Sequence, residues 1–172
     1  AVGRACGHRA YGCDLDPLAV LMARVWTTPI KYEEVVEAGR RVLVRAKYEF
    51  ESMSAGSAYP AKADQETRSF LRFWFDDYAR RQLAGLAISI NRVRRRNVRD
   101  ALWVAFSRLI IAKQAGASRA MDLSHSRPHR AFHRAPVKPF QAFEGAVIRV
   151  AMNCPQRSTR TRFGPATYTN LS

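Results

Sequence analysis

The sequence predicts an α/β fold that is mostly helical and contains a large helical insertion. A short strand that ends in an acid and runs directly into a proline-started helix, YGCDLDPLAV at 11–20, predicts the α/β part. Helical periodicity without a convincing strand over 31–116 predicts the insertion, because this block is too long for one crossover connection. Hydrophobic residues make up 47% of the 172 positions, which is enough for one domain with a real core.

The first unit, residues 1–30, is predicted to be a partial α/β unit. Its strand is HRAYGCD at 8–14. Asp16 is a good N-cap and Pro17 suits the first helical position, so a helix starts there, and Pro29 ends it. No convincing strand follows over 31–116, and AVIRVAM at 146–152 alone could be a strand, although its wider spacing favours a helix. The strand would therefore be isolated, and we expect marginal stability.

The insertion at 31–116 is predicted to form three long helices, at 31–53, 64–86 and 97–116. Asp64 and Asn97 are placed to cap the second and third helices, and Gly116 to end the third. The second helix is expected to bury a stripe of Phe70, Leu71, Trp74, Tyr78 and Leu83. Helical spacing also predicts core positions for the aromatic residues Phe73, Trp74, Phe75 and Trp103, in preference to a base-stacking role.

The last third of the chain divides into a basic His/Arg loop at 117–139, a helix at 140–152 and a loose tail at 153–172. The loop contains SHSRPHR, from which we predict nucleic-acid contacts by His125, Arg127, His129 and Arg130. The alternative is an ordered loop that braces the fold. We expect no metal site at the loop histidines, because Pro128 interrupts their alignment and no Cys or acid completes a tetrahedral set.

The charge is strongly positive, with 29 Lys and Arg against 14 Asp and Glu, or +15 at pH 7. Such an excess favours nucleic acid as a partner, and an anionic membrane surface second. No apolar run approaches the roughly 18 residues that a membrane span needs, so no membrane partner is expected. The run RVRRR at 92–96 suits either phosphate contacts or solvated charge between two helices, and we favour the second.

The cysteines Cys6, Cys13 and Cys154 are odd in number and widely spaced, so they predict no disulfide framework. They fit a reducing compartment, and a cytoplasmic location is expected. Cys13 is expected to be a small core residue. The chain starts at Ala1 with no visible signal peptide, which suggests a fragment or a processed product.

The acid that ends the strand at 8–14 is the candidate for ligand binding. In nucleotide-binding α/β domains, an acid at the carboxyl end of a strand accepts hydrogen bonds from ribose hydroxyls. Asp14 has this place, and Leu15 beside it can lie against an adenine face. The alternative is that Asp14 and Asp16 serve only the turn and the helix cap. The absence of a glycine-rich loop about 20 residues upstream favours this alternative.

Two stretches resemble DNA-modifying enzymes. GHRAYGCDLDPLAVLMARVWTTP resembles the region after the glycine-rich motif of amino-directed DNA methyltransferases, which use S-adenosylmethionine to modify adenine N6 or cytosine N4. ALWVAFSRLIIAKQAGASRAMDLSHSRPHR resembles a stretch within a bacterial DNA methylase-like group. Together the resemblance covers about the first 30 residues and about 97–150.

The resemblance implies a partial Rossmann-like class I methyltransferase fold, with 1–30 as the cofactor-binding unit and Asp14 and Leu15 on S-adenosylmethionine. It also implies DNA as the partner, with a flipped-out base as substrate, and a role in restriction, modification or defence. The family's FxGxG and [DNS]PP[YFW] motifs are missing, so no catalytic residue is assigned and the fragment alone is expected to be inactive. Two alternatives are a non-enzymatic basic helical module that binds nucleic acid or an acidic partner, and a degenerate methyltransferase kept for structure.

Overall fold

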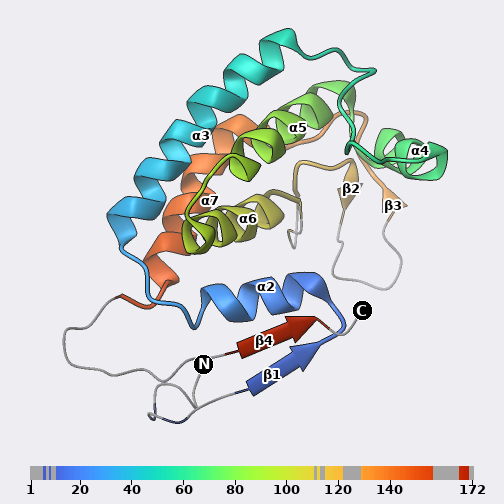
Figure 1. Cartoon of the computed structure of the whole chain (residues 1–172). Helices are drawn as coiled ribbons and strands as arrows, with labels where there is room; N and C mark the ends of the chain where they lie inside the picture. Colours follow the sequence, from blue (N-terminus) through green and yellow to red (C-terminus); the bar gives the residue numbers. More distant parts are fainter. Residues whose placement is uncertain are drawn as a thin grey trace.

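The computed structural model describes residues 6, 8, 11–110, 112, 115–121 and 129–156, and the backbone of 167–170. Six helices and two small two-stranded sheets form this part of the chain (Figure 1). Their bounds are β1 Tyr11–Asp14, α2 Pro17–Val25, α3 Tyr32–Ser52, α4 Gln65–Trp74, α5 Asp77–Asn91, α6 Arg96–Ile110, β2 Ala120–Met121, β3 His129–Arg130, α7 Pro139–Asn153 and β4 Thr167–Asn170. The predicted helical majority is confirmed, whereas the Rossmann-like fold is not.

A small parallel sheet forms from the two ends of the described chain. β1 pairs with β4 in a register that runs from Tyr11 opposite Thr167 to Asp14 opposite Asn170. α2 lies between this sheet and the other helices (Figure 1). The predictions of an isolated strand and of an entirely loose tail at 153–172 were therefore wrong. The segment TYTN has no apolar alternation, and its backbone pairs with β1, which a hydrophobic pattern does not reveal.

The core lies among α3, α5, α6 and α7. α3 packs against α5 and α7, and α6 packs against α7 and α2. The largest fully buried side chains are Phe143, Leu86, Ile90, Leu102 and Val35. Gly85 allows α3 and α5 to approach closely, because a Cβ there would lie 2.7 Å from the carbonyl oxygen of Ala46.

The helix predicted at 64–86 is two helices. The Asp76 carboxylate accepts a hydrogen bond from the Ala79 N–H at 2.9 Å and caps α5, so the chain turns between Trp74 and Asp77. Because of this turn, the expected single stripe is divided. Leu83 is buried, while Phe70 is 59% and Tyr78 51% exposed.

The boundaries of the other helices agree closely with those predicted from the sequence, and α6 is the exception. Asn97 lies inside α6 and does not cap it, since the helix begins at Arg96. The helix ends at Ile110, before Gly116. A Cβ on Gly116 would lie 2.8 Å from the carbonyl oxygen of Ile110, so only glycine lets the chain fold back over this helix end.

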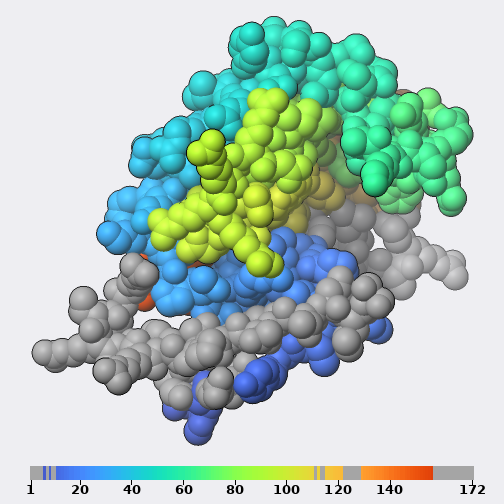
Figure 2. Space-filling model, in the orientation of Figure 1, coloured from blue at the N-terminus to red at the C-terminus, as the bar shows by residue number. Residues whose placement is uncertain are grey.

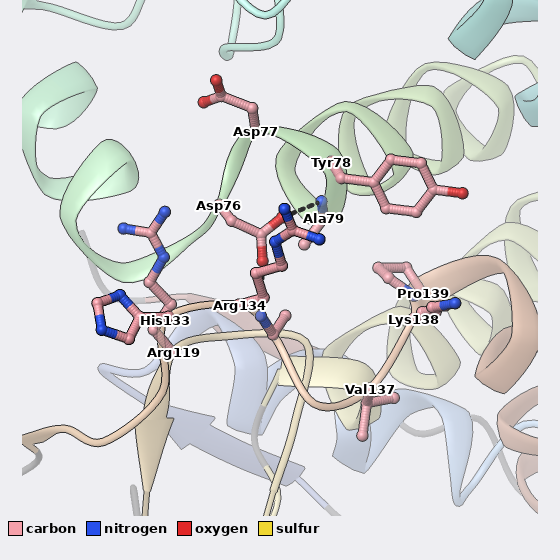
Figure 3. Close-up of a pocket in the computed structure, with 11 residues that line it drawn as sticks. Asp76, Asp77, Tyr78, Ala79, Arg119, His133, Arg134, Val137, Lys138 and Pro139 are labelled. Carbon is pink, nitrogen blue, oxygen red and sulfur yellow. Dashed lines mark hydrogen bonds between the residues drawn. The ribbon is translucent and has the colours of Figure 1, made fainter.

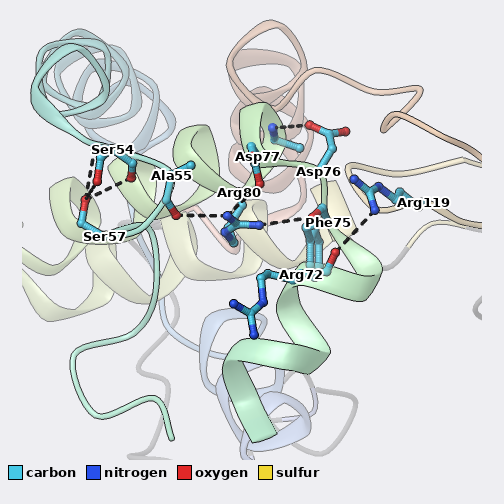
Figure 4. Close-up of polar contacts among 10 residues, drawn as sticks. Ser54, Ala55, Ser57, Arg72, Phe75, Asp76, Asp77, Arg80 and Arg119 are labelled. Carbon is cyan, nitrogen blue, oxygen red and sulfur yellow. Dashed lines mark hydrogen bonds and ion pairs between the residues drawn. The ribbon is translucent and has the colours of Figure 1, made fainter. Parts of the chain in front are cut away.

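A buried arginine supports the junction of α4 and α5. Arg80 donates to the carbonyl oxygens of Ala55 at 3.0 Å and Phe75 at 3.5 Å, and pairs with Asp77 at 2.8 Å (Figure 4). Its guanidinium also lies over the Tyr59 ring, 4.8 Å from the centroid. The junction is therefore held by charge-assisted hydrogen bonds as well as by the α5 cap.

Candidate cofactor corner and nucleic-acid interface

Asp14 lies where the sequence places it, at the carboxyl end of β1. Its Oδ1 accepts the Asp16 N–H at 2.9 Å, and Asp16 in turn accepts the Leu18 N–H at 2.8 Å as the cap of α2. Asp14 is exposed, and Leu15 is 77% exposed. Asp14 thus braces the turn with one oxygen, which leaves the exposed carboxylate able to accept a further hydrogen bond.

The carboxyl ends of β1 and β4 lie at the same edge, because the strands are parallel and Asp14 is opposite Asn170. In open α/β sheets, ligands bind outside the carboxyl ends of the strands. Cys13 is exposed, contrary to the expected core position, because β1 is exposed along most of its length.

A second region combines positive charge with exposed aromatic rings. We call it the basic–aromatic surface, and it consists of Phe73, Tyr78, Arg119, Arg130, Arg134 and Lys138. Except for Phe73 and Arg130, these residues line a groove of about 620 Å³ between the start of α5 and the segment that leads into α7. Figure 3 shows Arg119 and His133 on one side of this groove, Tyr78 and Lys138 on the other, and Arg134 between them.

Backbone hydrogen bonds fix the parts of this surface against one another. The Arg119 N–H donates to the Trp74 carbonyl at 2.7 Å, and the Arg119 carbonyl accepts from Ala131 at 2.9 Å and Phe132 at 3.1 Å. β2 and β3 are thereby held beside the end of α4 (Figure 1). Asp76 accepts the Ala135 N–H at 2.6 Å, which ties the next segment to the start of α5.

The aromatic rings are supported from behind. Phe73 meets Trp74 edge-on with centroids 4.9 Å apart, and the Arg130 guanidinium lies 5.7 Å from the centroid of Phe73. Phe73 is 49% exposed, so its predicted place in the core was wrong. α4 has no buried residue, because it packs on the rest of the molecule with only part of one face.

The structure describes two of the four residues that were predicted to contact nucleic acid. His129 and Arg130 form β3 and are exposed, whereas His125 and Arg127 lie outside the described residues. Sequence reasoning did not select Arg119, Arg134 and Lys138. The only sequence signal for them is the basic character of the whole 117–139 segment.

The run at 92–96 has a different environment. Arg92 pairs with Glu49 and Arg95 with Glu34, both on α3, and Arg96 lies 4.0 Å from Asp100. We call these three residues the paired arginine cluster. In the face shown in Figure 2, the yellow-green residues of this region and the green α4 occupy separate areas. The favoured interpretation, charge between helices, agrees with these contacts.

Other kinds of site find little support in the described part of the chain. No group of three His, Cys, Asp or Glu residues there is arranged to hold a metal ion. No helix in the described ranges is both long and apolar enough to cross a membrane. Cys6 is exposed like Cys13, while Cys154 is buried, and burial raises the pKa of its thiol to about 11.

Comparisons with protein-family models, curated proteins and solved structures gave no match.

Proposed function

We propose that this chain is part of an S-adenosylmethionine-dependent DNA amino-methyltransferase, in which Asp14 and Leu15 contact the adenosine part of the cofactor. The observation that carries the proposal is the place of Asp14, exposed at the carboxyl end of β1, beside a parallel strand and just before a capped helix. A carboxylate there suits ribose hydroxyls, which donate hydrogen bonds, and the exposed Leu15 side chain suits an adenine face. The resemblance of about the first 30 residues and of about 97–150 to DNA methylases supports the same function.

The overall charge of +15 supports DNA as the substrate. A bacterial enzyme of restriction, modification or defence would act on DNA in the cytoplasm, where unpaired cysteines stay reduced. The cofactor supplies an electrophilic methyl group, and the protein has to position an extruded base beside it. We assign no catalytic residue to this chain.

Cofactor binding by the whole gene product tests the proposal. The reading frame that encodes these residues, expressed to both natural ends, is expected to contain a glycine-rich loop upstream and a [DNS]PP[YFW] motif downstream. Asp14→Ala should then weaken S-adenosylmethionine binding about tenfold or more in calorimetry, because a hydrogen bond to a charged group is lost. The control Asp16→Ser removes a nearby charge but keeps the α2 cap, and it should bind normally. Equal affinity in both variants would contradict the role of Asp14.

A non-enzymatic nucleic-acid-binding module is the second candidate, favoured by the basic residues of 119–138 that have no recorded ion pair among the described residues. The two candidates differ in the extended reading frame. A frame without both motifs, whose product binds DNA but not S-adenosylmethionine, would favour the module.

A further inference from the structure

We infer that the basic–aromatic surface holds an unpaired strand of DNA, with phosphates against Arg134 and Lys138 and bases against Phe73 and Tyr78. The choice of DNA as the polymer rests on the proposed function. The surface itself is argued from charge, exposure and packing.

The positive charge of this surface is largely uncompensated. Arg119, Arg130, Arg134 and Lys138 have no ion pair within the described ranges. Asp76 and Asp77 also line the groove, but both carboxylates have partners already. Asp76 accepts N–H groups from Ala79 and Ala135, and Asp77 pairs with the buried Arg80. The exposed side chains of Arg130, Arg134 and Lys138 are therefore available to phosphate oxygens, which accept hydrogen bonds from guanidinium and ammonium groups. Arg119 is half-buried and donates to the Arg72 carbonyl oxygen at 3.4 Å (Figure 4), so it adds positive charge at the groove.

Exposed aromatic rings lie among these cations. Phe73 and Tyr78 are 49% and 51% exposed, and Phe70, one turn before Phe73, is 59% exposed. Trp74 supports both phenylalanine rings, and Tyr78 meets Phe50 edge-on at 5.4 Å. Rings fixed in this way lose little freedom when a base stacks on them. Aromatic rings along a basic groove are typical of single-strand binding, because every base has a face that can stack.

An unpaired strand fits these features better than a duplex does. In a duplex the base faces are covered by their neighbours, so exposed rings have nothing to stack on unless a base is extruded. The phosphates of single-stranded and of duplex DNA can both contact the cations, so charge alone does not distinguish the two forms. The aromatic rings therefore give the preference for unpaired DNA.

Fluorescence anisotropy with a labelled single strand of about 16 nucleotides, and with its duplex, tests this inference across a range of salt. Arg134→Ala/Lys138→Ala removes two unpaired cations, and Arg92→Ala/Arg95→Ala removes two paired ones with the same change in net charge. The first variant should weaken single-strand binding about tenfold and lower the salt slope by about 1.4, that is, 0.7 for each lost phosphate contact. The second should stay within about twofold of the parent, because its cations already have partners.

Phe73→Leu tests the stacking contribution separately. It keeps an apolar side chain and should weaken single-strand binding about fivefold or more while leaving duplex binding unchanged. Circular-dichroism melting confirms that each variant is folded. Equal loss in the two double variants, no effect of Phe73→Leu, or no binding by the parent chain would overturn the inference. S-adenosylmethionine binding should be normal in Arg134→Ala/Lys138→Ala, so a failure here is distinguishable from a failure of the Asp14 proposal.

Discussion

Two basic regions of this molecule hold their positive charges in different surroundings. In the paired arginine cluster, Arg92 and Arg95 reach across to carboxylates of α3, and Arg96 lies near Asp100. In the basic–aromatic surface, Arg119, Arg130 and Arg134 have no recorded ion pair in the part of the chain that the structure describes. The first region links helices, whereas the second presents Arg130 and Arg134 to solvent beside exposed rings.

The comparison shows why a run of basic residues is a weak predictor of binding. RVRRR is the densest basic stretch in the sequence, yet acids that are distant in sequence lie against it. The basic–aromatic surface is assembled from single residues on several elements, so it forms no run. The charges that remain available are determined by tertiary contacts with acids.

Replacing the buried Arg80 should have the largest effect on stability. Arg80→Met keeps most of the side-chain volume but leaves the carbonyls of Ala55 and Phe75 without their donor. We expect a loss of about 2 kcal/mol in the free energy of unfolding, measured by urea denaturation. Arg134→Met, on the exposed surface, should change it by less than about 0.5 kcal/mol. Similar losses in both variants would refute the distinction between structural and available arginines.

Removing the acids that pair with Arg92 and Arg95 should make the paired arginine cluster available to DNA. In Glu34→Gln/Glu49→Gln, Arg95 and Arg92 lose their partners, and single-strand affinity at low salt should rise about threefold. Glu33→Gln/Glu51→Gln changes the net charge equally at exposed α3 positions with no recorded ion pair in the described ranges. If the two variants gained the same affinity, net charge alone would explain the result.

The smallest effect concerns the start of α4, which carries Phe70 and Phe73. Hydrogen bonds from the side chain and the N–H of Thr67 hold the pKa of Asp64 below its usual value. The cap therefore contributes fully above the unfolded pKa of about 3.9 and is lost as the pH falls through the lower folded value. Hydrogen exchange at the Thr67 N–H should accelerate over that range relative to a mid-helix amide. In Asp64→Ser, which caps without charge, this pH dependence should disappear.

The sequence predicts some parts of this fold well because the signals are local. Asp16 and Pro17 mark the start of α2, and the helix predicted at 140–152 matches α7 to within a residue at each end. The break before α5 was missed because the apolar residues around it continue the helical pattern and hide the Asp76 cap. β4 was missed because its pairing with β1 uses backbone groups and joins distant segments.

Of the two candidate sites, only the one at Asp14 could be predicted from local sequence. Asp14 follows from a strand and a helix start within a few residues, so its position was predictable. The groove depends on contacts such as that of the Arg119 N–H with the Trp74 carbonyl and that of Asp76 with the Ala135 N–H. These join residues about 45 to 60 positions apart, and local patterns carry no information about them.

Ultraviolet cross-linking to a single strand that contains bromodeoxyuridine most directly tests which of the two basic regions binds DNA. Cross-linked peptides would be mapped by mass spectrometry, at a salt concentration that suppresses non-specific contacts. We expect cross-links at Phe73 or Tyr78, and their loss in Arg134→Ala/Lys138→Ala. Cross-links centred on 92–96 and the adjoining face of α3, unchanged in that variant, would contradict it.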